Sequence, residues 1–554
     1  MTGENHGSAA VPRSPLSVAL FRGLWLANLI SSLGYMIQSV GASWLMLELT
    51  SSPPMVALVQ TSITLPIMLL SLLSGAIADN LDRRRVMLTA QCFMLAVSSS
   101  LAILTYHGFA SPFVLLAFTF LIGCGTTLNT PAWQASVGDI VPKHSLPAAV
   151  ALNSAAFNIA RSAGPALGGA IVAFAGPAAA FLANCATYPL LIGVLLRWRP
   201  KEEIRTLPRE RIGSAMMNGL RYVIMSPNQR RVIARAMMFT VCASAIPALL
   251  PVIVRDVLGG TAITYGALLG AFGAGAVAGA LSSAPLRRRM SVNLIIAIAA
   301  AVAAAGGAVT GLSTSIFLTV PALIVVGGAW IMALSTLNVT VQLASPRWVL
   351  GRSISLYQMA AFGGIAIGSS GAGLAATHVG VMGAMLAAAA LLSIVTILGR
   401  TAPLPDIDHL NLDPLKKWRE PDNGLPIAPQ SGPIAVTIHY EIPPSSIGDF
   451  LSAMNERRRI RLRDGAKRWT LYRDLTDTGR WIERYHVATW LDYVRHNQRR
   501  TNADAANAEA ILALHTGPEP PKVYRRIQVD TEANSGAMET GHGSLYSQSI
   551  PVAP

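Results

Sequence analysis

The side chains of this chain that could do chemistry are few, and they lie within or beside strongly apolar segments. Arg161 is the only basic residue well inside such a segment, in the stretch 147–174. A charge in apolar surroundings is costly and is expected to face a polar cavity or a partner, so Arg161 predicts a role in substrate binding or gating. The alternative is that Arg161 reaches the membrane surface beside Asn153, Ser154 and Asn158.

Proton exchange would need a carboxylate within these segments. Proton-driven antiporters commonly use an Asp or Glu inside the membrane, because its change of charge can drive the transport cycle. The apolar segments of this chain are almost free of central carboxylates. Glu48, at one end of the first segment, is the leading candidate for proton coupling. The alternative is that Glu48 is an interfacial residue in contact with water.

Polar and aromatic side chains at mid-depth of the apolar segments are candidates for binding a substrate. These substrate-binding candidates are Gln38, Asn129, Trp133, Gln134 and Asn338. A cavity lined by Trp, Gln and Asn with little charge suits an amphiphilic or aromatic small molecule better than an inorganic ion. Each residue could instead form hydrogen bonds between helices. The four cysteines show no metal-ligand spacing, so we expect no metal and no cofactor.

Membrane-spanning helices must position these residues. The chain has 554 residues, of which 13% are charged, whereas soluble domains carry about 25%. Apolar runs recur that are long enough to cross a ~30 Å hydrocarbon core, and they lack the alternation of barrel strands. The sequence therefore predicts an all-α polytopic membrane protein with twelve transmembrane helices. The predicted spans are 20–46, 54–78, 86–106, 111–135, 147–174, 177–196, 231–254, 262–284, 291–312, 316–342, 351–376 and 379–399.

Basic residues mark every second connection between these spans. Clusters follow spans 2, 6 and 8, whereas the connections after spans 1, 3, 5, 9 and 11 contain no Lys or Arg. The positive-inside rule then places both termini in the cytoplasm, which requires an even number of spans. The net charge of +15 fits such loops. The expected partner is therefore a lipid bilayer, with no nucleic acid.

The two parts of the apolar region resemble each other. Gly75 precedes a triple arginine by eight positions, as Gly279 does, and Gly164 with Gly168 corresponds to a similar pair near 364–368. The repeat predicts two six-helix halves with a substrate site at their interface. The predicted domains are 1–16 (N-terminal tail), 17–200 (first half), 201–229 (cytoplasmic loop), 230–400 (second half), 401–433 (linker), 434–530 (small α+β domain) and 531–554 (disordered tail).

Two motifs resemble signatures of the major facilitator superfamily. The segment 75–85 resembles the signature between helices 2 and 3, with Asp82 where glycine is usual, and 158–169 resembles the Gly-Pro signature of antiporters. The first motif can form a latch between the halves, or only anchor positive charge at the cytoplasmic face. The gating residues that these resemblances imply are Gly75, Asp79, Arg83, Arg84, Arg161, Gly164, Pro165 and Gly168.

A closer resemblance covers about residues 15–400. The stretches 44–53 and 129–134 look like those of bacterial enterobactin exporters, also known as the transmembrane secretion effector family. The resemblance implies a multi-pass protein of the bacterial inner (plasma) membrane. It implies a transporter, not an enzyme, that exports a small drug-like or siderophore-like molecule by alternating access and is driven by protons. The rivals are a nutrient importer, an enzyme that acts through its tail, and a sensor.

The region 434–530 has the pattern of a soluble domain. Its expected strands and helices follow the order βαββαβ, which is that of a ferredoxin-like fold. It resembles dimeric α/β-barrel domains of the monooxygenase type, which implies homodimerisation through the tail. A regulatory or dimerising role is favoured over catalysis. The arginines of the helix 446–463 are expected either on a solvated face or in contact with anionic lipid. Four aromatic residues are expected to line a pocket, to lie in the core or to form a dimer contact: Trp469, Trp481, Tyr485 and Trp490.

Overall fold

The computed structural model describes residues 14–199, 212–346, 348–401 and 425–529, with a few positions between 403 and 421. These residues form two compact units. The helical bundle holds residues up to 216, 231–342 and 354–404. The tail unit holds 217–230, 343–353 and the described residues beyond 406. Three predicted segments lie wholly or partly outside the described residues: 1–13 of the N-terminal tail, 201–211 of the inter-half loop, and the disordered tail 531–554. The rest of the predicted loop is largely helical, since α6 (Ile212–Met225) falls within it.

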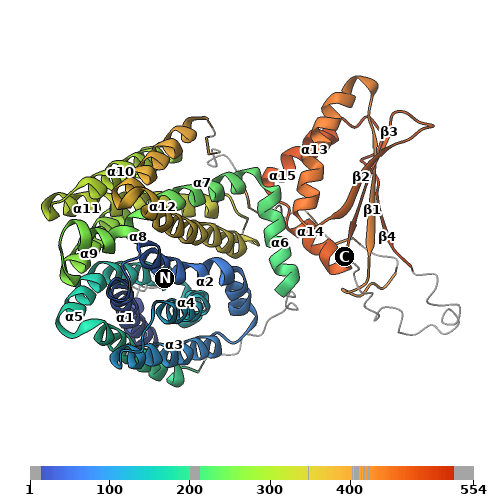
Figure 1. The fold of residues 1–554 in the computed structure, drawn as a ribbon. Coiled ribbons are helices and arrows are strands. Elements are labelled where there is room, and N and C mark those ends of the chain that lie inside the picture. Colours follow the sequence, from blue (N-terminus) through green and yellow to red (C-terminus); the bar gives the residue numbers. More distant parts are fainter. Residues whose placement is uncertain are drawn as a thin grey trace, which may run out of the picture. The chain divides into compact units, whose positions relative to one another are not determined.

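The helical bundle consists of long apolar helices (Figure 1). In the described part of the chain, ten helices are long and apolar enough to cross a membrane when α7, α8 and the π-helical turn η3 count as one. The predicted helical membrane fold is thereby confirmed. The elements are α1 (Ala19–Leu49), α2 (Pro53–Asn80), α3 (Arg83–Tyr106), α4 (Pro112–Ile140), α5 (Leu146–Arg197), α7 (Pro227–Ala243), α8 (Ala245–Val252), η3 (Ile253–Val257), α9 (Ala262–Arg287), α10 (Val292–Leu312), α11 (Ile316–Leu343) and α12 (Leu350–Thr401).

Two of these helices are far longer than a membrane is thick. α5 and α12 each contain 52 residues, which as straight helices would measure about 78 Å. Each is interrupted by one glycine with positive φ, Gly176 at 80° and Gly380 at 73°. Only glycine adopts this conformation at low cost, so each long helix bends there. Gly176 lies between predicted spans 5 and 6, and Gly380 is the second residue of predicted span 12 (379–399).

Side-chain caps begin several of the helices. The Asp82 carboxylate accepts hydrogen bonds from the backbone N–H groups of Arg84 and Arg85, at 2.9 and 3.3 Å, and so caps α3. Ser291 caps α10 in the same way. A carboxylate at a helix N-terminus satisfies free N–H groups and complements the helix dipole. Asp82 therefore has a local structural role at the position where the resembled signature has glycine.

Glycines let the helices approach backbone to backbone. A Cβ added to Gly164 would lie 2.5 Å from Cβ of Met36 in α1, and one added to Gly169 would lie 2.8 Å from Cα of Gly266 in α9. In the second half, the predicted counterpart Gly364 faces α7, where an added Cβ would lie 2.8 Å from the Met237 oxygen. Small residues at such contacts permit tight helix packing in lipid. The repeat seen in the sequence thus corresponds to matching helix contacts, α5 on α1 and α12 on α7.

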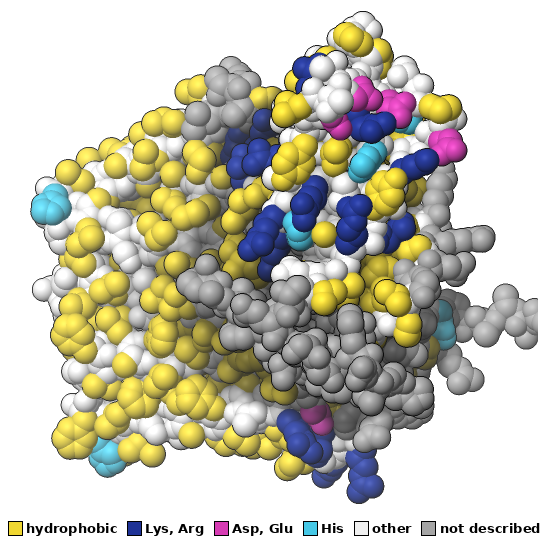
Figure 2. Space-filling model, turned by 90° about the vertical axis from the view of Figure 1, so that its right-hand side faces the viewer, with side chains coloured by type: hydrophobic (Ala, Val, Ile, Leu, Met, Phe, Trp, Pro, Cys, Tyr) yellow, Lys and Arg dark blue, Asp and Glu magenta, His cyan; other side chains and the backbone are white. Residues whose placement is uncertain are grey.

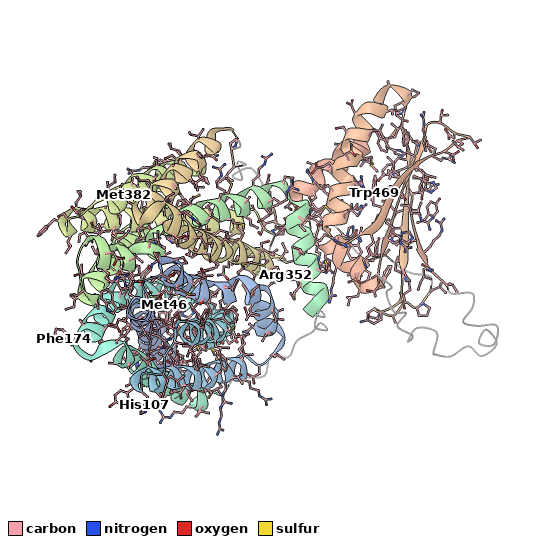
Figure 3. All side chains as sticks on the ribbon, in the orientation of Figure 1. Met46, His107, Phe174, Arg352, Met382 and Trp469 are labelled. Carbon is pink, nitrogen blue, oxygen red and sulfur yellow. The ribbon has the colours of Figure 1, made fainter. Side chains whose placement is uncertain are left out.

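The outside of the helical bundle is apolar. Phe174 and Phe317 are 85% and 92% exposed, and Figure 3 shows Phe174 and Met382 pointing away from the helices while Met46 lies inside. Hydrophobic side chains cover much of the bundle surface in Figure 2. An exposed apolar surface of this extent suits contact with lipid rather than water.

The tail unit contains a small antiparallel sheet covered by helices on one face (Figure 1). The strands lie in the order β2-β3-β1-β4. The predicted order of strands and helices is present, except that the second predicted helix is divided in two, because Thr501 and Asp504 form a capping box that begins a new helix. The elements are α6 (Ile212–Met225, of which residues from 217 belong to this unit), β1 (Ile434–Glu441), α13 (Ile447–Arg463), β2 (Lys467–Arg473), β3 (Arg480–Val487), α14 (Trp490–Gln498), α15 (Asn502–Ala513) and β4 (Val523–Ile527).

Charged residues lie in the core of the tail unit. The Glu483 side chain is fully buried, and it accepts hydrogen bonds from Arg461 Nε at 3.1 Å, Trp469 Nε1 at 3.0 Å and the Tyr440 hydroxyl at 2.8 Å. Burial raises the pKa of Glu483, but Arg461 and Arg457 outweigh it and hold that pKa below its usual value. Arg457 and Arg461 are only 7% and 4% exposed. The expectation of a solvated or lipid-contacting face is therefore wrong for these two arginines of α13.

Removal of this buried carboxylate is expected to destabilise the tail unit. Glu483→Gln leaves Arg457 and Arg461 buried without their counter-charge, which should lower the free energy of unfolding by about 3–5 kcal/mol. Hydrogen exchange of the β1 and β3 amides in the full-length protein, as a function of urea, measures this free energy. The matched control is Glu456→Gln on exposed α13 surface, expected within about 0.5 kcal/mol of the original. Equal stability of the two variants would contradict the proposed role of Glu483.

Candidate functional site

Two pairs of helices make close contacts between the halves of the helical bundle. α5 packs on α9, where an added Cβ at Gly266 would lie 2.6 Å from the Pro165 carbonyl oxygen. α2 packs on α12, where the Thr61 hydroxyl donates to the Ala366 carbonyl at 3.1 Å and lies 2.9 Å from the Ser370 hydroxyl. Side chains beside these contacts come from both halves. A substrate site between the halves must lie among them.

Arg161 of α5 faces an aromatic cluster on the other half. Its guanidinium carbon lies 5.6 Å from the ring centroid of Phe272 in α9. Phe272 packs edge to face on Trp330 of α11 at 6.0 Å, and Trp330 on Phe239 of α7 at 6.2 Å. Among the described residues, no hydrogen bond or ion pair reaches the Arg161 side chain. The arrangement is a cation on an aromatic face, a contact that stabilises by about 2 kcal/mol when desolvated. The N–H donors of the Arg161 guanidinium therefore remain available to another group.

The rings of this cluster were not identified from the sequence. The candidates chosen there were four Gln and Asn residues and Trp133, whereas Phe239, Phe272 and Trp330 are all buried and apolar. The available signal was composition, since Phe272 lies in the run Gly270–Ala276 among Gly and Ala and Trp330 follows Gly-Gly-Ala. Large rings among small residues fill the space that small residues leave between helices. No local pattern indicates that three separate helices bring these rings together.

Three buried polar atoms on α4, α5 and α11 have no hydrogen-bond partner among the described residues. They are Asn129 Oδ1, Ser162 Oγ and Thr336 Oγ1. Buried polar groups are nearly always hydrogen-bonded, to protein or to water, so each of these atoms can bond to water or to a polar group of a solute. Ser162 is adjacent to Arg161 on α5. Asn129 is one of the substrate-binding residues predicted from the sequence.

Two other predicted substrate-binding residues lie within the N-terminal half. Gln38 Oε1 accepts a hydrogen bond from the Ser98 hydroxyl at 2.8 Å and another from Asn184 Nδ2, which links α1, α3 and α5. Trp133 is 6% exposed and packs in an apolar cluster with Phe21 and Leu24 of α1. These positions match the alternative raised from the sequence, in which such residues hold helices together.

The remaining binding and coupling candidates are spread apart. Gln134 is exposed on α4. Asn338 accepts a hydrogen bond from Gln342 one turn later in α11. Glu48 is exposed near the end of α1, and it forms no ion pair with the described residues. The structure does not gather Gln134, Asn338 and Glu48 around Arg161 by any described contact.

The predicted latch residues contact mainly their own half. Arg83 pairs with Asp139 of α4 and donates to the Ala135 carbonyl at 3.1 Å. Arg84 donates to the carbonyls of Leu195 and Leu196 at the end of α5, at 2.8 and 3.0 Å, where free carbonyls favour a cation.

Several other predicted gating residues lie at contacts between helices, either within one half or between the two. An added Cβ at Gly75 would meet the Ser355 hydroxyl of α12 at 3.3 Å. Gly164 and Gly168 face α1, and Pro165 faces α9. The side chain of Asp79 is outside the described residues. Asp139, the partner of Arg83, was missed because it lies 56 positions away in the sequence.

A second set of contacts joins the halves at the bundle end without basic clusters, where Arg255 is the single Lys or Arg residue of the loops. Arg255 Nη1 donates to the Leu47 carbonyl at 2.8 Å, and the same guanidinium pairs with Asp256. The Trp44 and Tyr265 rings stack at 6.4 Å. These contacts tie α1 to the C-terminal half. Among the described side chains, no cluster of three His, Cys, Asp or Glu residues could hold a metal ion.

Known proteins share this fold. A bacterial homologue of the human lysosomal transporter Spinster, in an inward-facing and unoccupied conformation, has a TM-score of 0.55 at 16% identity, over 71% of this chain and 98% of that one. A nucleoside transporter has a TM-score of 0.55 at 12% identity, over 69% of this chain and 98% of that one. These identities show a common fold and no more.

Curated relatives are MFS-type transporters. The staphyloferrin A transporter of Staphylococcus aureus is 28% identical over 241 residues, which are 42% of this chain and 59% of that protein. The match thus spans less than two thirds of that relative. An MFS-type transporter of Bacillus subtilis, itself uncharacterized, is 24% identical over 393 residues, which are 68% of this chain and 92% of that protein.

The family match extends further than these relatives. Residues 10–533 match the family described as transmembrane secretion effectors. The matched range includes the helical bundle, with Arg161 and its aromatic cluster, and nearly all the described part of the tail unit. This chain therefore belongs to the transmembrane secretion effector family of MFS-type transporters.

Proposed function

We propose that this transporter exports a small amphiphilic or aromatic molecule, drug-like or siderophore-like, across the bacterial inner membrane by alternating access. The observation that carries the proposal is Arg161 against Phe272, Trp330 and Phe239 at the interface of the halves. An aromatic solute with a negative charge can pair with the guanidinium and stack among the rings. The relative named staphyloferrin A transporter supports the siderophore class.

Alternating access requires that contacts between the halves open in turn. The Arg255–Leu47 hydrogen bond and the Trp44–Tyr265 stack close one end of the bundle. We propose that this end faces away from the cytoplasm, since its loops contain a single Lys or Arg residue, Arg255, beside Asp256. Opening it would separate α1 from the C-terminal half while the α5–α9 backbone contact acts as the pivot.

Proton coupling is the proposed source of energy, and it rests on the resemblance to antiporters. Glu48 is the candidate proton acceptor, because it is exposed near the end that is proposed to open outward. A nutrient importer of the same fold remains the rival within the class, and an enzyme acting through its tail is the rival outside it. The direction of transport in cells separates the first rival from export.

The two bent helices support twelve spans with both termini in the cytoplasm. Each of α5 and α12 would cross the membrane twice, with Gly176 and Gly380 at the outer turns. In a variant without native cysteines, Ala175→Cys and His378→Cys should react with a membrane-impermeant thiol reagent added to spheroplasts. The control Arg288→Cys, on a basic loop, should react only after permeabilisation. Labelling of Arg288→Cys in intact spheroplasts would contradict this topology.

Efflux from cells tests the function directly. In cells without their own pumps, the protein should lower the accumulation of one or more members of a panel of aromatic drugs and catecholate siderophores. A protonophore should restore the accumulation, because it removes the proton gradient. Higher accumulation than in empty cells would instead support an importer. No difference across the whole panel would contradict export of this class.

Arg161 should be required for that transport. Arg161→Gln removes the charge that faces Phe272, and we expect the efflux rate to fall at least ~10-fold, the effect of losing one charged hydrogen bond. Arg161→Lys, which keeps charge without the planar fork, should retain part of the rate. The control is Arg85→Gln, whose side chain is 85% exposed. Normal efflux by Arg161→Gln, at equal protein in the membrane, would remove Arg161 from the substrate site.

A further inference from the structure

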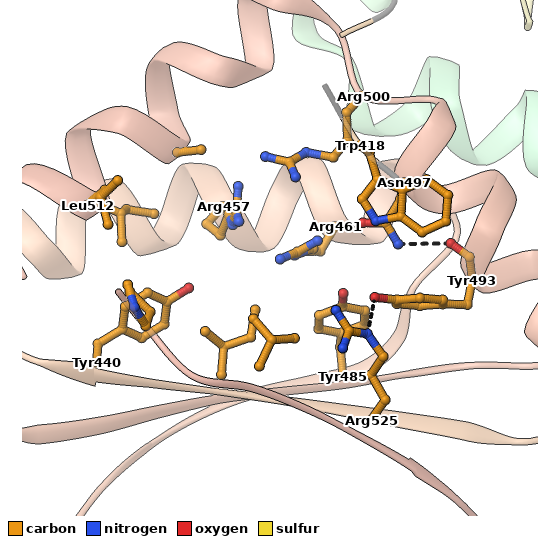
Figure 4. Close-up of a pocket in the computed structure, with 15 residues that line it drawn as sticks. Trp418, Tyr440, Arg457, Arg461, Tyr485, Tyr493, Asn497, Arg500, Leu512 and Arg525 are labelled. Carbon is orange, nitrogen blue, oxygen red and sulfur yellow. Dashed lines mark hydrogen bonds between the residues drawn. The ribbon is translucent and has the colours of Figure 1, made fainter. Parts of the chain in front are cut away.

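The tail unit contains a cavity of about 240 Å³ between its sheet and its helices (Figure 4). Arg457 and Arg461 of α13 and Arg500 after α14 reach toward it from the helix side. Tyr485 and Arg525 reach toward it from the strands. No Asp or Glu stands among the described residues that line this cavity. Four guanidinium groups thus meet around one small space.

The positive charge of the cavity is only partly compensated. Glu483 is the nearest described carboxylate, and its oxygens already accept hydrogen bonds from Arg461, Trp469 and Tyr440. Arg457 Nε is 3.9 Å from Glu483 and has no hydrogen-bond partner, although Arg457 is only 7% exposed. A buried charged donor without a hydrogen bond is costly, so the cavity is incomplete without an acceptor.

Arg500 adds a further unneutralised charge. Among the described residues, no hydrogen bond or ion pair reaches its guanidinium. Burial, together with the nearby charges of Arg457 and Arg461, lowers the pKa of Arg500 to about 10, so it stays protonated at neutral pH. His496 accepts no proton here, because burial and Arg461 hold its pKa well below the usual value. An anion would relieve the repulsion among the three arginines.

The remaining walls indicate what kind of anion fits. Ile438, Ile511 and Leu512 supply apolar surface. The Tyr485 ring lies under the Arg461 guanidinium at 4.5 Å, and the Tyr493 hydroxyl accepts from Arg525 Nε at 2.7 Å. The volume is below the ~300–1,000 Å³ typical of sites for drug-sized ligands. A small ring or short aliphatic body with acidic groups matches both the size and the lining.

We propose that this cavity is a binding site for a small organic anion that carries carboxylate or phosphate groups on an aromatic or short aliphatic body. The acidic groups pair with Arg457, Arg461 and Arg500, whose planar guanidinium groups match either oxygen geometry. The body packs on Tyr485 and the apolar wall. This site is separate from Arg161 and its aromatic cluster, so the proposal does not depend on what the helical bundle transports.

Titration calorimetry on the full-length protein in detergent tests the site. The probes are phthalate with two carboxylates, phenyl phosphate, and neutral benzamide as the uncharged control. We expect saturable 1:1 binding of at least one anion, with little change between pH 6 and 8, and no binding of benzamide. Stronger binding of phthalate would assign the site to carboxylates, and stronger binding of phenyl phosphate to phosphates. Absence of binding by both anions, or equal binding of benzamide, would overturn the proposal.

A variant pair then locates the binding. Arg500→Gln should lower the affinity for the anion at least ~10-fold, since it removes one charged contact without breaking a described hydrogen bond. Arg459→Gln removes the same charge from exposed α13 surface and should leave the affinity unchanged. Hydrogen exchange of the tail unit checks that both variants stay folded. Equal weakening by the two variants, or none by Arg500→Gln, would show that the anion binds elsewhere or only through overall charge.

Discussion

Close approach of helix backbones is the constraint on which the helical bundle depends. In lipid there is little hydrophobic drive to join helices, so packing must come from contact area and short distances. α5 meets this requirement on two sides, with Gly164 and Gly168 against α1 and Gly169 against Gly266 of α9. The second contact is also the boundary between the halves. The position of Arg161, within two turns of Gly169 and opposite Phe272, follows from that contact.

Much of this architecture could be predicted from the sequence. Span positions, the repeat, and the order of strands and helices in the tail depend on local patterns of hydrophobicity and turn residues. The bend at Gly176 lies where spans 5 and 6 were separated, and the bend at Gly380 lies one residue after the predicted start of span 12. The division between α14 and α15 was missed because the cap at Thr501 lies inside a continuous helical pattern. Arg161 was chosen as a candidate because a lone charge in an apolar segment is itself a local signal, and its role stays a prediction.

Contacts between distant residues could not be predicted in this way. Phe239, Phe272 and Trp330 come from three helices, and nothing in any one helix shows that their rings meet. Arg457 and Arg461 looked like surface residues, because burial of arginine depends on a carboxylate that lies on another strand, Glu483. Gln38 looked like a cavity residue, whereas its partners Ser98 and Asn184 lie 60 and 146 positions away.

α5 carries both packing glycines and Arg161, and evolution should treat substitutions at the glycines differently from substitutions at the rings that face Arg161. The glycines at 164, 168 and 169 contact neighbouring backbone so closely that even a methyl group would collide, so those positions can vary little without loss of packing. The partners of Arg161 are ring faces, which other side chains of similar size can replace with modest loss of stability. Under the proposed function, a lineage could adapt to a new solute by exchanging the rings while the contact between the halves stays as it is. Selectivity would then depend on the rings of α7, α9 and α11, and the mechanics on the glycines of α5.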